Sequence, residues 1–191
     1  MISEDLRTRN ELRKRLYEIR RAITETRPDV GARLNMQLSR LLTMLNMTTV
    51  GVYIPFRAEP NVMGAIQRWL AGNPKCCAAL PVVDETEAGM HYARYRPGDN
   101  LCKGRFGIEV PEVDQVINPQ VIVSPCVGFT SKGYRLGNGG GYFDRYLKAC
   151  QVKPQTVIVG YDALLCETFK PAQHDIPMDW IVTEARLDRT G

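Results

Sequence analysis

A run of glycines between a strand-like segment and an amphipathic one constrains this chain more than any other feature. Five of its sixteen glycines lie in residues 133–147, whose sequence is GYRLGNGGGYFDRYL. An apolar run over 121–125 precedes this segment, and an amphipathic helix is predicted to follow the glycines. Glycines allow positive φ and close approach of a ligand, and the helix dipole favours an anion, so this order is typical of a phosphate cradle. Glycine loops are also common tight turns, and the glycines alone leave both interpretations open.

Length and composition indicate one ordinary globular domain. With 191 residues, 44% of them hydrophobic and 24% charged, the chain can bury a core, and we predict a single domain over 1–191. No apolar run approaches the length of a membrane span, and the first residues are too polar for a secretory signal. We therefore expect a cytoplasmic protein that has no membrane partner, and we expect a monomer. The six cysteines include no C-x-x-C pair, and we interpret them as small buried side chains.

Short apolar runs alternate with helical periodicity along the chain. We expect helices over residues 3–26, 30–44, 61–71, 142–150 and 164–169. We expect strands over residues 49–54, 76–83, 89–95, 121–125, 156–161 and 180–183, with an irregular segment between 97 and 118. This alternation predicts an α/β fold, namely a three-layer α/β/α domain with a mostly parallel or mixed sheet. A helical N-terminal segment, residues 1–45, is predicted to pack on it.

Polar residues around the glycines favour a phosphate ligand. The segment matches neither G-x-x-x-x-G-K-[ST] nor G-x-G-x-x-G, so the standard nucleotide signatures are absent. Arg135 and Lys132 place positive charge beside the loop. Asp144, in the first turn of the predicted helix, suggests a Mg²⁺ ligand, because a carboxylate repels polyphosphate unless a divalent cation lies between them. The alternative is a favourable interaction of Asp144 with the helix dipole, with Arg145 as its local partner.

The positive charge is concentrated in the first helix. Residues 1–40 contain ten Lys or Arg against six Asp or Glu, whereas the remaining residues contain fifteen of each. Arg9, Arg13 and Arg20 share one face, and Arg9 and Arg13 can reach one anion together because they lie about one turn apart. A solvated basic face is the alternative. The even balance after residue 40 argues against a nucleic-acid partner.

Three further residues are candidates for a binding site. Glu59 lies just beyond the carboxyl end of the strand over 49–54, where binding residues collect in open α/β sheets, although a loop Glu is often only solvated. Phe106, in the irregular segment, is predicted to be either an anchor or a ligand platform. His174, beside Asp175, we interpret as a residue that satisfies a loop.

Together these motifs resemble the 5-formyltetrahydrofolate cyclo-ligase family, whose members are also called methenyltetrahydrofolate synthetases. The family signature R-L-G-x-G-x-G-Y-Y-D-R-x-L, which follows a strand and a Phe-Asp pair, is matched nearly throughout by residues 135–147. The basic motif Arg9-x-x-Leu12-Arg13 and the position of Glu59 also resemble the family. Further matches cover residues 80–82, 90–95, 107–108 and 174–184, so the resemblance spans nearly the whole chain.

The resemblance implies a reaction and a set of site residues. The reaction would convert 5-formyltetrahydrofolate into 5,10-methenyltetrahydrofolate, with Mg²⁺ as cofactor, ATP as co-substrate, and release of ADP and phosphate through a phosphorylated formyl group. Catalytic roles are implied for Arg135, Asp144 and Arg145, with Asp144 as the metal ligand. The implied ATP-binding residues are Arg9, Arg13, Arg135, Gly137, Gly139, Gly140, Gly141, Tyr142 and Asp144. The implied residues for the reduced folate are Glu59, Met90, Phe106 and Tyr142.

The chain departs from the family pattern at four positions. Thr130 replaces an Asp after Phe129, Arg9 replaces Lys, Phe143 replaces the second Tyr, and Val110 replaces a polar residue. Thr130 matters most, because the loss of a carboxylate near the phosphates would weaken the placement of Mg²⁺. Two alternatives to an active cyclo-ligase therefore remain: a divergent member that binds ATP or folate without this reaction, and a binding module built on the basic first helix.

Overall fold

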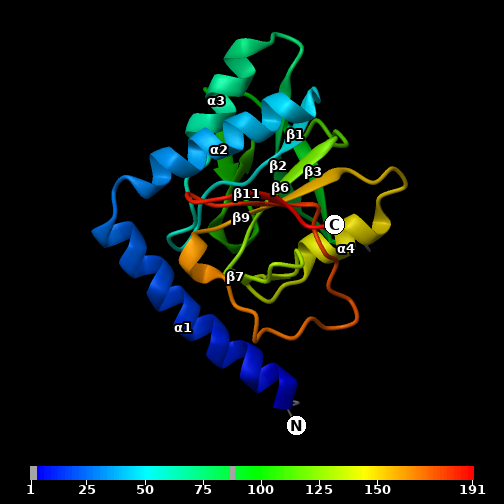
Figure 1. Ribbon diagram of the computed structural model, residues 1–191. Helices are drawn as coiled ribbons and strands as arrows, with labels where there is room; N and C mark the ends of the chain where they lie inside the picture. Colours follow the sequence, from blue (N-terminus) through cyan, green and yellow to red (C-terminus); the bar gives the residue numbers. More distant parts are fainter. Residues whose placement is uncertain (1–3, 87–88) are drawn as a thin grey trace.

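Seven strands form one mixed sheet at the centre of the molecule (Figure 1). The structure, a computed structural model, describes residues 4–86 and 89–191. The strands of the sheet, in the order β11-β10-β9-β6-β1-β2-β3, are β11 Leu187–Arg189, β10 Trp180–Val182, β9 Gln155–Val159, β6 Val121–Pro125, β1 Thr49–Gly51, β2 Cys77–Val83 and β3 Met90–Tyr95. Neighbouring strands from β10 to β2 pair in parallel, and β11 and β3 flank them as antiparallel edges.

Helices cover the sheet, and the predicted α/β class is confirmed. Helices α2 (Val30–Leu45) and α3 (Met63–Gly72) pack on each other and on one side of the sheet, whereas α4 (Tyr142–Ala149) contacts β3. Helix α1 (Glu4–Thr26) extends past the sheet and runs beside the segment that follows β9 (Figure 1). Residue 3, where this helix was predicted to begin, lies outside the described residues. The first two helices thus agree closely with the periodicity of the sequence.

Helices α2 and α4 both contribute side chains to the packing around the sheet. Leu34, Leu38 and Leu41 of α2 are fully buried, as the spacing of three and four residues predicts. Burying one such side chain contributes roughly 1.5–3 kcal/mol. At the other edge, the rings of Tyr92 on β3 and Tyr146 on α4 meet edge-to-face with centroids 5.2 Å apart. These contacts fix the helices against the strands whose ends build the site.

Several predicted elements differ in the structure. Strand β1 ends at Gly51 rather than at residue 54, because the chain then leaves the sheet and the Tyr53 hydroxyl donates to the carbonyl of Pro60. The predicted helix over 164–169 is wrong: a short 3-10 turn, η2 (Asp162–Leu164), is followed by non-helical chain, where the Cys166 amide donates to the carbonyl of Phe129. Pairing with a distant strand overrides the local helical pattern there.

Small strands were missed in segments that the sequence marks as irregular or glycine-rich. Strands β4 (Leu101–Lys103) and β5 (Glu109–Pro111) form a separate two-stranded sheet, with the 3-10 turn η1 (Arg105–Gly107) between them. Strands β7 (Gly128–Phe129) and β8 (Arg135–Leu136) form a hairpin between β6 and the glycines. The prediction of buried cysteines holds for Cys126 alone, since the others are half-buried or exposed; all six are free thiols.

Candidate active site

One large cleft, about 1360 Å³ in volume, opens at the carboxyl ends of the parallel strands. Its floor includes Tyr53 beyond β1, Pro81 and Val83 at the end of β2, and Pro125 at the end of β6. Around this floor lie α1, the glycine loop with the start of α4, the β4–β5 hairpin and the segment 168–175. Such a position is where open α/β sheets bind ligands, because the loops after parallel strands converge there.

The glycine loop ends directly at the N-terminus of α4. Gly139 has φ +106° and Gly141, the residue before the helix, has φ +66°. Residues other than glycine rarely adopt such backbone conformations. Residues 139–144 all line the cleft, so the start of the helix faces it. The backbone N–H groups of a first helical turn have no partner within the helix and attract anions. The loop therefore has the geometry of an anion cradle.

Arg135 and Asp144 lie together beneath this loop. Both are buried, and Arg135 Nη2 is 3.3 Å from Asp144 Oδ2, while the Ile176 amide donates to Asp144 Oδ1 over 3.2 Å. The guanidinium also lies over the ring of Phe143, 5.2 Å from its centroid. The partner of Asp144 is therefore Arg135, and not Arg145 as the dipole interpretation assumed.

Arg135 retains a donor without a partner. Among the described residues, its buried Nε makes no hydrogen bond, and its buried Nη2 has the ion pair with Asp144 in place of one. A buried guanidinium donor without a partner is costly, and the positive charge of Arg135, which lines the cleft, favours an oxyanion there. The arrangement thus fits a phosphate group beside Arg135.

Two arginines of α1 reach the same cleft. Arg9 donates to both carboxylate oxygens of Asp175, over 2.9 and 3.3 Å, and Arg13 Nε donates to the carbonyl of Gly137 over 2.8 Å. Burial and the neighbouring Arg9 lower the pKa of Arg13 from its ordinary value. Burial opposes the ionisation of Asp175, but the hydrogen bonds from Arg9 and from the Ala172 amide lower its pKa overall. These arginines face the protein, which argues against a solvated basic face.

Glu59 is a buried carboxylate that lines the cleft beside the glycine loop. It is 7% exposed; its Oε2 accepts from the Phe56 amide over 3.0 Å, and its Oε1 lies 3.4 Å from Asn138 Nδ2. Burial raises the pKa of Glu59, although the Phe56 amide and Arg20 act in the other direction. The alternative that Glu59 is only a solvated loop residue is therefore wrong, because its side chain is buried.

Two aromatic rings and Met90 form an apolar wall. Phe106 is 62% exposed yet lines the cleft, and its ring lies 6.1 Å from that of Tyr142. Its φ is +61°, which is unusual for a bulky residue and is found where function or packing enforces it. The exposure of this ring rules out a core anchor, and Met90 lies buried in the same cleft.

The residues present fit a magnesium ion that is shared with a ligand. Among the described residues, no group of three or more His, Cys, Asp or Glu side chains is placed to hold a metal. Mg²⁺, however, commonly uses one or two carboxylates and takes its other ligands from phosphates and water. Asp144 supplies such a carboxylate beside the glycine loop.

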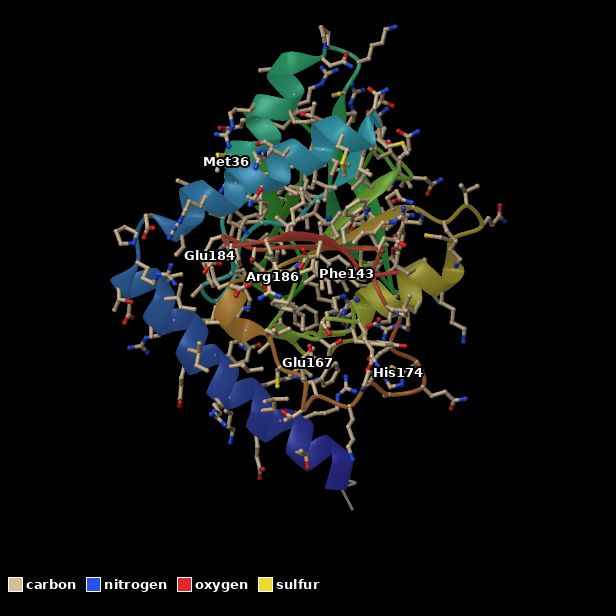
Figure 2. The ribbon with its side chains drawn as sticks, in the orientation of Figure 1. Met36, Phe143, Glu167, His174, Glu184 and Arg186 are labelled. Carbon is tan, nitrogen blue, oxygen red and sulfur yellow. The ribbon has the colours of Figure 1, made fainter. Side chains whose placement is uncertain are left out.

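Not every residue singled out from the sequence lines the cleft. Arg145 is exposed, donates to the carbonyl of Gly140 over 2.8 Å and lies over the ring of Tyr142, so it supports the loop from outside. Lys132 is exposed and does not line the cleft. His174 does line the cleft, but its side chain is 77% exposed. In Figure 2 this residue lies on the orange loop at the lower right, away from Phe143.

Thr130, where the family pattern has Asp, lies outside the cleft. Its side-chain oxygen accepts from the Tyr134 amide over 3.3 Å and its own amide donates to the carbonyl of Tyr134, so it closes the β7–β8 turn. A hydroxyl performs this task as a carboxylate would. The contacts of Thr130 therefore give it a role in this turn, and the weaker Mg²⁺ placement expected from its side chain stays a prediction.

Sequence reasoning missed residues that support the site. Asn138, inside the glycine run, accepts a hydrogen bond from the Tyr17 hydroxyl over 2.5 Å and donates toward Glu59. Arg20 is entirely buried below Glu59. Its place on the face of Arg9 and Arg13 was the available signal, but periodicity cannot tell a buried arginine from a solvated one.

The fold and the site together are those of an α/β enzyme whose cleft has the size for small molecules and carries a net positive charge. Six Lys or Arg side chains line the cleft against four Asp or Glu, and the cradle faces an apolar wall. Among the helices of the described residues, none is both long and apolar enough to cross a membrane.

Comparisons with known proteins identify the family. The model of the 5-formyltetrahydrofolate cyclo-ligase family matches residues 5–184, so the chain belongs to this family of ligases. The 5-formyltetrahydrofolate cyclo-ligase of Escherichia coli K12 is 30% identical over 177 residues, which cover 88% of this chain and 96% of the relative. The enzyme of the same name from Mycolicibacterium smegmatis is 28% identical over 190 residues, 94% and 95% of the two chains.

Solved structures share the fold. The 5,10-methenyltetrahydrofolate synthetase of Aquifex aeolicus is 30% identical, has a TM-score of 0.75, and is matched over 95% of this chain and 92% of its own. That of Mycoplasma pneumoniae is 22% identical with a TM-score of 0.75, over 92% and 98% of the chains, and shows likeness of fold. The resemblance inferred from the motifs is thus confirmed at the level of family and fold.

Proposed function

We propose that this protein converts 5-formyltetrahydrofolate and ATP into 5,10-methenyltetrahydrofolate, ADP and phosphate. The observation that carries the proposal is that one cleft holds two unlike subsites side by side. A glycine cradle with Arg135 suits a polyphosphate, and a buried Glu59 and an aromatic wall that line the same cleft suit a flat ring with N–H donors. Membership of the cyclo-ligase family supports the same reaction.

The chemistry explains why both subsites are needed. In the formyl group, N5 donates its lone pair into the carbonyl, so the carbon is a poor electrophile and its oxygen a poor leaving group. Attack of the formyl oxygen on the γ-phosphorus of ATP releases ADP and makes that oxygen expellable as phosphate. N10 then bonds to the carbon, loses its proton, and the C–O bond breaks to give the methenyl bridge. Holding N10 beside the carbon makes this closure effectively intramolecular.

On this proposal the charged residues serve the phosphates. Arg135, Arg13 and Arg9 bind phosphate oxygens, and the glycine loop supplies backbone N–H donors at the start of α4. Asp144 would hold Mg²⁺, which when bound supplies neutralisation of charge on the phosphates. Arg145, which contacts the loop from outside, keeps the cradle in shape.

The folate would occupy the other half of the cleft. The ionised Glu59 accepts hydrogen bonds from the amide and amino N–H groups of the pterin, and Phe106, Tyr142 and Met90 contact its faces. The basic-helix binding module loses its support, because Arg9, Arg13 and Arg20 are engaged within the fold.

The direct test is to combine purified protein with 5-formyltetrahydrofolate and Mg-ATP. We expect the absorbance of the methenyl product to rise in a 1:1 ratio with ADP release, and chelation of Mg²⁺ to stop both. Binding of ATP or folate by calorimetry without any product at high enzyme concentration would instead indicate the divergent, binding-only member.

A further inference from the structure

A single buried guanidinium connects three parts of the fold beneath the cleft. Arg20 on α1 has no exposed surface; its Nη1 donates to the carbonyl of Cys126 over 3.0 Å, and its Nη2 donates to the carbonyl of Arg57. The same Nη1 lies 4.0 Å from Glu59 Oε1. Arg20 thus ties the first helix to the chain beyond β6 and to the loop that carries Glu59.

That loop requires such support. Arg57 and Ala58 both have left-handed backbone conformations, with φ of +49° and +61°, although neither is glycine. Consecutive residues in this region persist only where the surroundings hold them. Arg20 bonds the loop at the first of the two, and Glu59 closes it by accepting from the Phe56 amide.

The charge of Arg20 matters as much as its hydrogen bonds. Glu59 is buried, and its neighbours Tyr53 and Cys126 are neutral, because burial raises the pKa of Cys126 to about 12 and that of Tyr53 well above its ordinary value. Asn138, from the glycine loop, is uncharged. The cations that face Glu59 are Arg20, entirely buried, and Arg57, on the exposed part of the same loop.

We propose that Arg20 is a positioning residue for the substrate site: it holds the 56–59 loop in its left-handed turn and keeps the Glu59 carboxylate ionised. An ionised carboxylate accepts hydrogen bonds from the N–H donors of the substrate, whereas a protonated one would present a competing donor. This inference rests on the proposed role of Glu59, and its first test needs no turnover.

The first test is an NMR titration of the Glu59 carboxyl carbon, assigned by its absence in Glu59→Gln. In Arg20→Gln we expect the midpoint to rise by one pH unit or more, a tenfold change in proton affinity. Arg21→Gln is the matched control, since it removes the same charge one residue along the helix from a side chain that is 77% exposed. An unchanged midpoint in Arg20→Gln overturns the proposal.

A second measurement covers the case in which Arg20→Gln does not fold. In the wild-type protein, the side-chain nitrogen resonances of Arg20 should shift with pH at the same midpoint as the Glu59 carboxyl carbon. Arginine resonances that do not respond at that midpoint contradict the pairing.

The kinetic test separates positioning from simple stability. In the wild type, the folate KM should rise as falling pH protonates Glu59. In Arg20→Gln this rise should begin at a higher pH, while the KM for ATP stays within about twofold of the wild-type value. Arg20→Lys should restore the wild-type profile because it keeps the charge. A Lys variant that behaves like Gln overturns the role of charge. If the wild type forms no product while Glu59 still shifts in the titration, the proposed function fails and the pairing of Arg20 with Glu59 stands.

Discussion

The guanidinium of Arg135 and the carboxylate of Asp144 lie 3.3 Å apart inside the cleft, Nη2 to Oδ2, on either side of the glycine loop. Arg135 comes from β8 and Asp144 from the first turn of α4, so the loop between them is fixed at both ends. The pair keeps a cation and an anion available to one ligand. A Mg-polyphosphate has a use for each of them, because its oxygens need donors and its metal needs a carboxylate.

Asp144→Asn should abolish most of the Mg²⁺-dependent turnover. We expect kcat/KM to fall on the order of 10- to 100-fold, the range typical of lost metal-site support. Binding of ATP without Mg²⁺ should not weaken, because a negative charge beside the phosphates is removed; calorimetry with and without the metal measures both. Asp188→Asn, an exposed carboxylate on β11, is the control, and an Asp144 variant with normal Mg²⁺ dependence would remove the metal role.

Arg13→Ala should raise the KM for ATP more than the KM for folate. The change removes a charge-assisted hydrogen bond to Gly137 as well as a phosphate contact, together worth about 1.5–3 kcal/mol, or roughly 10- to 100-fold. Steady-state kinetics with each substrate varied in turn measures the difference. Arg21→Ala, on the solvent side of the same helix, should leave both constants unchanged. An equal rise in both for Arg13→Ala would contradict a phosphate contact.

Glu59→Gln should have the opposite effect. We expect the folate KM to rise by about tenfold or more while the KM for ATP changes little, because the amide cannot match a buried carboxylate as an acceptor. Fluorescence titration with 5-formyltetrahydrofolate provides the matching affinity. Folate binding that stays as tight as in the wild type would count against the assignment.

Gly139→Ala isolates the backbone conformation of the cradle. The nearest atom to an added Cβ is 3.7 Å away, so there is no clash, but φ is +106°. We expect a loss of roughly 1 kcal/mol in the free energy of unfolding and a raised KM for ATP. Gly72→Ala in α3, where φ is ordinary and the space is open, should cost nothing. Thermal unfolding with and without ATP compares them, and equal behaviour of the two variants would argue against a strained cradle.

Stability should decline as pH rises from neutrality because of His91. Its Nδ1 lies 2.6 Å from Asp84 and its Nε2 2.7 Å from Asp114. Burial alone would lower the pKa of His91, but the hydrogen bonds that the ring donates to the two carboxylates raise it above its ordinary 6.5. A group with a raised folded-state pKa stabilises the protein fully below its unfolded pKa and loses this effect as pH rises through the folded value.

The pH-dependent stability can be assigned by substitution. Denaturant unfolding between pH 6 and 9 should show the decline in the wild type and in His174→Gln, whose side chain is exposed, but not in His91→Gln. On the acidic side, burial alone would raise the pKa of Asp84, but its hydrogen bond with His91 lowers that pKa overall. The stabilisation from Asp84 is therefore present above the ordinary pKa of 3.8 and is lost as the pH falls below it. If the free energy of unfolding of the wild type stays constant above pH 6.5, His91 does not stabilise the fold through Asp84 and Asp114.

The sequence by itself determined the elements whose pattern is local. The spacing of Leu34, Leu38 and Leu41 determines helix α2, and the apolar run over 121–125 determines β6, because a helix face and a buried strand are short-range consequences of where apolar residues fall. Gly139 and Asp144 identify a candidate anion site in the same way. The family could likewise be recognised from the glycine segment and its flanks.

Only the tertiary structure decided which charged residues face each other. Arg20 and Arg9 read alike in the sequence, yet one is buried against Glu59 and the other is paired with Asp175, 166 residues away. Thr130 stands where the family pattern has a carboxylate, and only the fold shows that its side chain bonds to the backbone of a turn. Such outcomes depend on desolvation and on the packing of segments far apart in the chain, and neither is encoded in the spacing of nearby residues.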